Sequence, residues 1–234
     1  SDKIPFFDGF VVGEDYLKKE ILKLTDWHTE DLFESEEDDM IVANFSRVFC
    51  DPERFSDDEQ EVMSKVGMGV LYEKGDDGTD IRLVNKSLRE KILNEYYHPH
   101  HSLLSASVNR QLSHRGEAVI IDCHSYPSVP FIRDLSQTPN RPDFNIGIDS
   151  FHTPNELKEK SIQFFRDKGF SLGIDQPYSG TIVPMEHYKK NKEVKSIMLE
   201  INRGLYLVPG TNQKSDNYFQ IKEVVKEFIE LIRD

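Results

Sequence analysis

Two apolar segments that each end in ionisable side chains constrain the fold of this chain most strongly. Residues 119–128 read VIIDCHSYPS, and residues 196–203 read SIMLEINR. Both have the length and aliphatic content of a buried strand. The first segment carries Asp122 and His124 at its end, and the second carries Glu200. Because sites in open α/β sheets lie outside the carboxyl ends of the strands, we expect these side chains to line one shared cleft.

The remainder of the chain alternates strand-like runs with amphipathic segments. Apolar side chains at helical spacing predict helices, and short apolar runs between turn residues predict strands. The predicted helices are 14–24, 87–115, 153–170 and 216–234, the second of them in two pieces broken at Pro99. A further helix is expected to begin in the acidic segment after Pro52. The predicted strands are 40–49, 117–123, 145–149 and 195–201. We therefore predict one α/β domain over residues 1–234, with a mainly parallel central sheet and helices on both faces.

Composition narrows the class of protein. The chain of 234 residues has 29 Lys and Arg against 42 Asp and Glu, a net charge of −13. This balance argues against nucleic-acid binding, which needs a basic face, but a few local arginines can still attract a small anion. No apolar run approaches the roughly 18 residues of a membrane span, and nothing resembles a signal peptide. We expect Cys50 and Cys123 to be free buried thiols, a cytoplasmic location, and a solvated loop at the acidic run 34–39.

His124 is the first candidate for chemistry. Asp122 lies two residues before it, so both side chains should project from one face of a strand. A carboxylate beside a metal-bound imidazole commonly fixes its tautomer, which predicts His124 as a metal ligand oriented by Asp122. The alternative is a histidine that only makes structural hydrogen bonds. A Cys123–His124 nucleophile pair is disfavoured because adjacent strand residues face opposite ways.

Glu200 is the second candidate. A carboxylate at the end of an apolar strand is costly to bury without a partner or a purpose. The functional interpretation is a general base that takes a proton from water and passes it to the leaving group. The alternative is an ion pair with Arg203, which follows closely.

Further candidates would bind a metal or an anionic substrate. If residues 26–34 are helical, Asp26 and Glu30 share a face at i and i+4 and offer hard oxygen ligands; an acid-rich helix start is the alternative. An arginine beside an amide can bind a carboxylate bidentately. The candidates for that role are Asn109, Arg110, Arg47 and Arg54.

Six segments together resemble the N-formylglutamate amidohydrolase family. They are TDWHTEDLF, ANFSRVFCDPERF, IIDCHSYPS, PDFNIGID, PYSGTIVP and SIMLEINRGLY, in the order in which the family has them. The family is in turn similar to zinc carboxypeptidases of the pancreatic type. The resemblance implies a phosphorylase/hydrolase-like fold, a three-layer α/β/α sandwich, with zinc as the cofactor.

The activity that this resemblance implies is hydrolysis of N-formyl-L-glutamate to formate and glutamate, the last step of one histidine-degradation route. A metal would polarise the formyl carbonyl, and Glu200 would deprotonate the attacking water. Arg110, with Arg54 or Arg47, would hold the carboxylates of this small anionic N-acyl amino acid, and Tyr178 would close over it. The sequence carries no signal for an oligomeric state.

The chain departs from the family at its beginning. Family members open with an apolar strand and a Pro-His-Ser segment just before an Ile-Pro pair such as Ile4-Pro5, and this histidine resembles a first metal ligand. The chain begins after that segment, so we expect the first strand to be missing, through truncation or divergence, and zinc to bind weakly or not at all. Alternative functions are deacylation of another N-acyl amino acid and a degenerate, non-catalytic binding domain.

Overall fold

The two segments that dominate the sequence form the longest strands of a four-stranded sheet. In the computed structural model, which describes residues 1–233, they are β1 (Ala118–Tyr126) and β4 (Val194–Asn202). These two strands are parallel, whereas β2 (Phe144–Gly147) pairs antiparallel with β4 and parallel with β3 (Leu172–Ile174). The strand order is β1-β4-β2-β3. The predicted α/β class is confirmed, with a mixed sheet whose pairings are mostly parallel.

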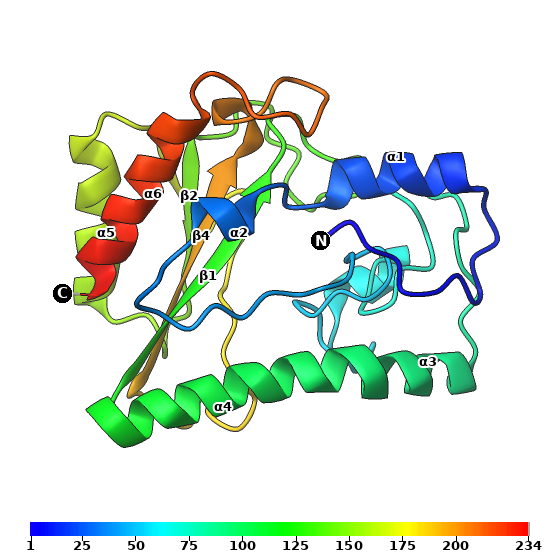
Figure 1. Ribbon diagram of the computed structural model, residues 1–234, viewed down its shortest axis with the longest axis horizontal. Helices are drawn as coiled ribbons and strands as arrows, with labels where there is room; N and C mark the ends of the chain where they lie inside the picture. The colour runs from blue at the N-terminus through cyan, green and yellow to red at the C-terminus, as the bar shows by residue number, and fades with distance from the viewer. Residues whose placement is uncertain (234) are drawn as a thin grey trace. The chain divides into compact units, whose positions relative to one another are not determined.

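One face of the sheet is apolar and packs against helices. Alternate side chains of β4 point to this face and join residues of α5 (Asn155–Asp167) and α6 (Tyr218–Arg233) in one buried core, in which Phe165 and Phe228 lie between helix and sheet. Figure 1 shows α5 and α6 next to each other along the sheet. The apolar stripe of α6 is buried, as its helical spacing predicts: Ile221, Val224, Val225, Phe228, Ile229 and Ile232.

The opposite face of the sheet is polar and is covered by loops. Backbone of the segment after β3 approaches the sheet closely at Gly147. A Cβ atom there would lie 2.2 Å from the carbonyl oxygen of Gly180 and 2.4 Å from Cε of Met198. A glycine is therefore needed at this position, because any side chain would push the covering loop away from the polar face.

The described chain divides into two compact units. The first contains Ser1–Thr25, Ile41–Leu104 and Phe131–Arg133, and the other described residues form the second, which includes the whole sheet. The first unit has α1 (Glu14–Leu24), confirmed over the predicted range, and its own apolar clusters around Tyr72 and Phe49. The single domain over residues 1–234 stays a prediction. No helix within residues 1–233 has the length and apolar character to cross a membrane.

Three predictions about the first half of the chain are wrong. Residues 40–49 have irregular backbone with a turn at 47–49 instead of a strand. Val48 and Phe49 are fully buried without any sheet pairing, whereas Met40 and Val42 are exposed, so apolar content alone did not indicate a strand. The acidic segment after Pro52 leads only to a short 3₁₀ helix, Val62–Val66.

Pro99 does not break the helical region either. The region runs from α3 (Lys86–Ile92) through a π-helical segment, Leu93–Tyr97, into α4 (His98–Arg115). Pro99 is the second residue of α4. A change of hydrogen-bond pattern just before a proline accommodates its missing N–H, so the helix continues past it.

Asp31 ties the short helix α2 (Thr29–Leu32) to α6 in the second unit. Its carboxylate accepts hydrogen bonds from Lys214 Nζ at 2.7 Å, Lys222 Nζ at 2.6 Å and the Tyr218 hydroxyl at 2.5 Å. The hydrogen bond from Lys214, followed by those from Lys222 and Tyr218, holds the pKa of Asp31 well below its ordinary value. The charged form is therefore the one that stabilises the fold.

We expect Asp31→Asn to lower the melting temperature at pH 7. The carboxylate is about one-third exposed, so water screens it and we assign about 1 kcal/mol, or roughly 2–4 °C. Because the folded pKa lies below the unfolded value of about 4, this stabilisation is complete above pH 4 and is lost as the pH falls further. Thermal denaturation at pH 7 and pH 3 checks this, with Asp2→Asn as the control. A difference that persists undiminished at pH 3 would contradict the assignment.

Candidate functional site

His124 and Glu200 lie next to each other on the polar face of the sheet. In the parallel pairing of β1 with β4, His124 is the register partner of Glu200, and Glu200 is in turn the partner of Asn145 on β2. Residues directly opposite each other on neighbouring strands project to the same face. The predicted sharing of one face by the imidazole and the carboxylate is confirmed.

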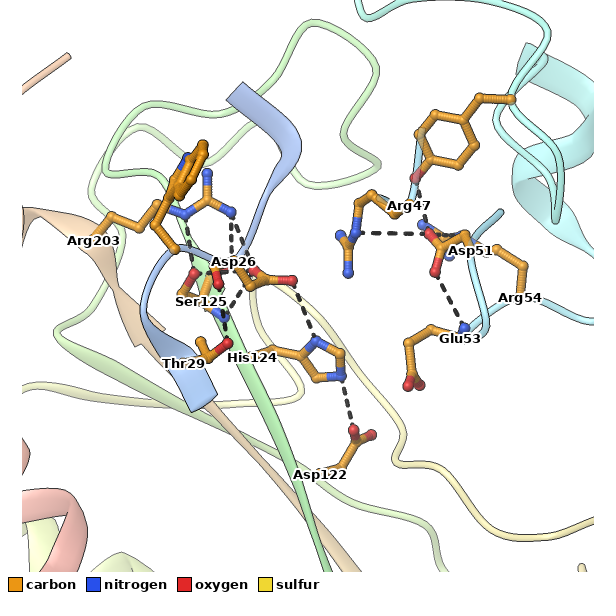
Figure 2. A network of polar contacts seen from close by, with 12 residues as sticks. Asp26, Thr29, Arg47, Asp51, Glu53, Arg54, Asp122, His124, Ser125 and Arg203 are labelled. Carbon is orange, nitrogen blue, oxygen red and sulfur yellow. Dashed lines mark hydrogen bonds and ion pairs between the residues drawn. The ribbon is translucent and has the colours of Figure 1, made fainter. Parts of the chain in front are cut away.

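The imidazole of His124 lies between two carboxylates. Its Nε2 is 2.7 Å from Oδ1 of Asp122, and its Nδ1 is 3.7 Å from Oδ2 of Asp26 (Figure 2). The backbone N–H of Ile182 donates to the second oxygen of Asp122 at 2.9 Å. Only 14% of the His124 side chain is exposed. Asp122 thus fixes the ring orientation through Nε2, with Nδ1 directed toward Asp26, and the expected pairing of Asp122 with His124 is confirmed.

Cys123 points the other way. Its side chain packs against the apolar core beneath α5 and α6, whereas His124 lies on the polar face. Neither Cys50 nor Cys123 forms a disulfide within residues 1–233, as predicted; Cys50 is buried as expected, whereas Cys123 is only partly buried. The arrangement gives no support to a Cys123–His124 nucleophile pair.

Asp26 reaches the site by a route that the sequence interpretation did not foresee. Helix α2 begins at Thr29, so the expected helical i, i+4 alignment of Asp26 with Glu30 is wrong. Asp26 precedes the helix, and its carbonyl oxygen accepts the hydroxyl of Thr29 at 3.0 Å. The turn directs the Asp26 side chain toward His124, whereas Glu30 is exposed. Metal ligation by either residue stays a prediction.

Glu200 is buried, with 6% of its surface exposed, between strands on both sides. Burial, with the charge of Glu200 as the next contribution, raises the pKa of Tyr126. Tyr126 follows His124 by two residues on the same strand face. The hydroxyl of Tyr126 therefore stays protonated on the polar face that also carries the carboxyl group of Glu200.

Two of the predicted substrate-binding residues are engaged with other side chains of the second unit. Asn109 and Arg110 are exposed on α4. The Asn109 amide donates to Oε1 of Glu186 at 3.0 Å, and Arg110 forms an ion pair with Asp39. A substrate carboxylate would have to compete with these partners, so their substrate-binding role stays a prediction.

The remaining predicted substrate-binding residues occupy different places. In the first unit, Arg47 and Arg54 flank Asp51, with Nε to Oδ2 distances of 3.9 Å and 3.6 Å. In the second unit, the hydroxyl of Tyr178 lies 3.0 Å from the carboxylate oxygens of Asp134. The structure thus gives Tyr178 a fixed position on its loop.

Sequence interpretation overlooked Arg141 and gave Arg203 only a possible ion pair with Glu200. Only 1% of the Arg141 side chain is exposed; its guanidinium pairs with Asp134 and also donates to the Tyr178 hydroxyl at 3.3 Å. It precedes β2 in a Pro-rich segment that composition assigns to a surface loop. Arg203 is buried and forms an ion pair with Asp26 at 3.1 Å. Its position directly after β4 was the feature of the sequence that could have placed it near the site.

Nδ1 of His124 and a carboxylate oxygen of Asp26 have the spacing of two ligands of one divalent metal. Nδ1 of His124 and Oδ2 of Asp26 are 3.7 Å apart, and two ligand bonds of about 2.0–2.2 Å can span that separation. By contrast, the 2.7 Å between Nε2 and Asp122 is a hydrogen-bond distance. An imidazole nitrogen and a carboxylate oxygen are ligands that zinc commonly takes.

Comparison with known proteins decides the family. The family model described as N-formylglutamate amidohydrolase matches residues 8–207. The chain belongs to this family. It is 22% identical over 193 residues to N-formylglutamate deformylase of Pseudomonas putida, a match that covers 78% of this chain and 70% of the relative. The family that the six segments indicate is therefore confirmed.

Solved structures show the same fold. The crystal structure of an N-formylglutamate amidohydrolase from Ralstonia eutropha superposes with a TM-score of 0.78 at 23% identity, covering 96% of this chain and 86% of that one. A gene product of Agrobacterium tumefaciens gives a TM-score of 0.54 at 16% identity, covering 81% and 66% of the two chains. The amidohydrolase fold therefore extends over nearly all of this chain.

Proposed function

We propose that this protein hydrolyses the amide bond of N-formyl-L-glutamate to give formate and glutamate. Membership of the N-formylglutamate amidohydrolase family and the likeness to a deformylase support this reaction. The observation that carries it is the placement of Glu200 directly beside His124 on one polar face. That pairing sets a proton acceptor next to a group suited to ligating a metal.

In this mechanism Glu200 is the general base. Its buried carboxylate accepts a proton from the attacking water and returns it to the nitrogen of the departing glutamate. Neighbouring strands on both sides hold Glu200 in place, so little reorganisation is needed when the proton moves. Asp122 holds the ring of His124 through Nε2, which fixes the direction in which Nδ1 points.

We propose that His124 and Asp26 hold a zinc ion, with Glu30 as a further candidate. Zinc bound there would supply Lewis-acid polarisation of the formyl carbonyl. Two or three ligands bind zinc less tightly than a full set, so we expect zinc to bind here weakly and to need adding to the assays. Family membership also supports the finer three-layer α/β/α description of the fold.

The substrate-binding assignments are part of the same proposal. Glutamate carries two carboxylates, and arginine is suited to binding them bidentately. Our candidates remain Asn109, Arg110, Arg47, Arg54 and Tyr178. The cytoplasmic location and the role in histidine degradation likewise remain predictions.

The reaction is tested with added zinc on three compounds. Formate release is measured from N-formyl-L-glutamate and N-formyl-L-alanine, and acetate release is measured from N-acetyl-L-glutamate. We expect N-formyl-L-glutamate to have the highest kcat/KM. N-formyl-L-alanine lacks the side-chain carboxylate and so loses one charge-assisted contact, at about 1.5–3 kcal/mol. Its kcat/KM should therefore be roughly 10- to 150-fold lower. Faster cleavage of the acetyl compound would favour the deacylase alternative, and no cleavage of any of the three would favour a binding domain.

A further inference from the structure

Arg203 is placed to hold the carboxylate that faces His124. It begins a 3₁₀ helix, Arg203–Leu205, directly after β4, and 8% of its surface is exposed. Its Nε donates to Oγ of Ser125 at 3.0 Å, and its Nη2 donates to Oδ1 of Asp26 at 3.1 Å and to the carbonyl oxygen of Ser125 at 3.2 Å. The guanidinium therefore joins the end of β1 to the turn before α2.

These contacts fix the rotation of the Asp26 carboxylate. Oδ1 accepts three hydrogen bonds: from the backbone N–H of Ser125 at 3.1 Å, from the Ser125 hydroxyl at 3.0 Å and from Arg203. Oδ2 is the oxygen that lies near Nδ1 of His124. Figure 2 shows Asp26 between Arg203 and Ser125 on one side and His124 on the other. Anchoring one oxygen by three donors aims the other at the imidazole.

Energetics favour an orienting role over a purely stabilising one. The side chains of Asp26 and Arg203 are only 15% and 10% exposed. At such burial the cost of desolvating two charges offsets much of their attraction, so an ion pair of this kind is weak support for stability. What the pair does provide is a defined geometry, because a guanidinium donates from several fixed directions.

We propose that Arg203 is a positioning residue that holds Asp26, directly and through Ser125, in the orientation that binds a divalent cation together with His124. This inference rests on the proposed function, because it concerns the metal which that hydrolysis requires. Arg203 acts on the cation only through Asp26. Without it, Oδ1 of Asp26 would keep only the two donors of Ser125, and the carboxylate would be held less firmly in this direction.

The test is calorimetric titration of zinc into the metal-free full chain, comparing wild type with Arg203→Met, Arg203→Lys and Ser125→Ala. Removing a residue that orients a ligand commonly costs about 10- to 100-fold in metal affinity, and we expect a loss of this size for Arg203→Met. Lysine restores the charge but not the fork of donors, so Arg203→Lys should fall between Arg203→Met and wild type. The exposed Arg166 of α5 offers a matched control, Arg166→Met, which should bind zinc as wild type does.

The outcomes separate this inference from the proposed function. Zinc affinity unchanged in a folded Arg203→Met protein, or no zinc binding by wild type, would overturn the inference. If Arg203→Met does not fold, Ser125→Ala decides, because it removes one hydroxyl donor to Asp26 and must weaken zinc binding. A third outcome is that wild-type protein binds zinc in a way that depends on Arg203 and yet releases no formate. That result would contradict the proposed function while supporting the positioning role.

Discussion

Replacing Glu200 by glutamine is expected to lower kcat for formate release from N-formyl-L-glutamate by about 10²- to 10⁴-fold, the contribution that a positioned general base makes. Glutamine has nearly the same shape, so it fits the buried position between β1 and β2, but it cannot accept the proton of the attacking water. KM should change little, because Glu200 is assigned to the reaction and not to substrate binding. Steady-state kinetics with saturating zinc measures both constants.

A matched substitution controls for the loss of a carboxylate as such. Glu159 is exposed on α5, and Glu159→Gln should leave kcat and KM unchanged. Circular dichroism should show that E200Q retains its helices and strands. If folded E200Q releases formate at the rate of wild type, Glu200 is not the base, and the assignment of the reaction to this face fails.

The second large effect is expected at His124. His124→Gln removes the imidazole Nδ1 that faces Asp26, while its amide can still hydrogen-bond to Asp122. Loss of a metal ligand should lower zinc affinity by more than the roughly 10- to 100-fold expected for an orienting residue. Activity should fall in parallel, because the proposed mechanism assigns polarisation of the formyl carbonyl to the metal. Calorimetric zinc titration and formate release measure the two effects.

His114 supplies the control for this substitution. It is exposed near the end of α4, and His114→Gln should bind zinc and release formate like wild type. Zinc binding of equal strength in His124→Gln and wild type would show that the metal is held elsewhere on the chain.

Local patterns in the sequence were sufficient for the two long strands that carry the site. An apolar run of strand length predicts β1 and β4, and the alternation of side chains along a strand predicts that Asp122 and His124 share a face. The pairing of His124 with Glu200 follows once both strands are parallel and end at the same edge. Helical spacing was equally informative for α6, whose apolar stripe spans more than three turns.

Interactions between distant segments could not be predicted in this way. The ion pair of Asp26 with Arg203 joins residues 177 positions apart, and no local period reports such a contact. The acidic run 34–39 is an exposed loop, as predicted, but its ion pairs with Arg233, at 2.7 Å to Glu37 and 2.6 Å to Asp38, could not be foreseen. Apolar content alone also misled at residues 40–49, since burial in an irregular segment selects the same residue types as a strand.

Diffraction at the zinc absorption edge, from crystals soaked in zinc, tests most directly whether His124 and Glu200 serve one metal-assisted site. We expect an anomalous peak within ligand-bond distance of His124 Nδ1 and Asp26, on the face of the sheet from which Glu200 projects. A zinc peak away from His124, or on the face covered by α5 and α6, would contradict it.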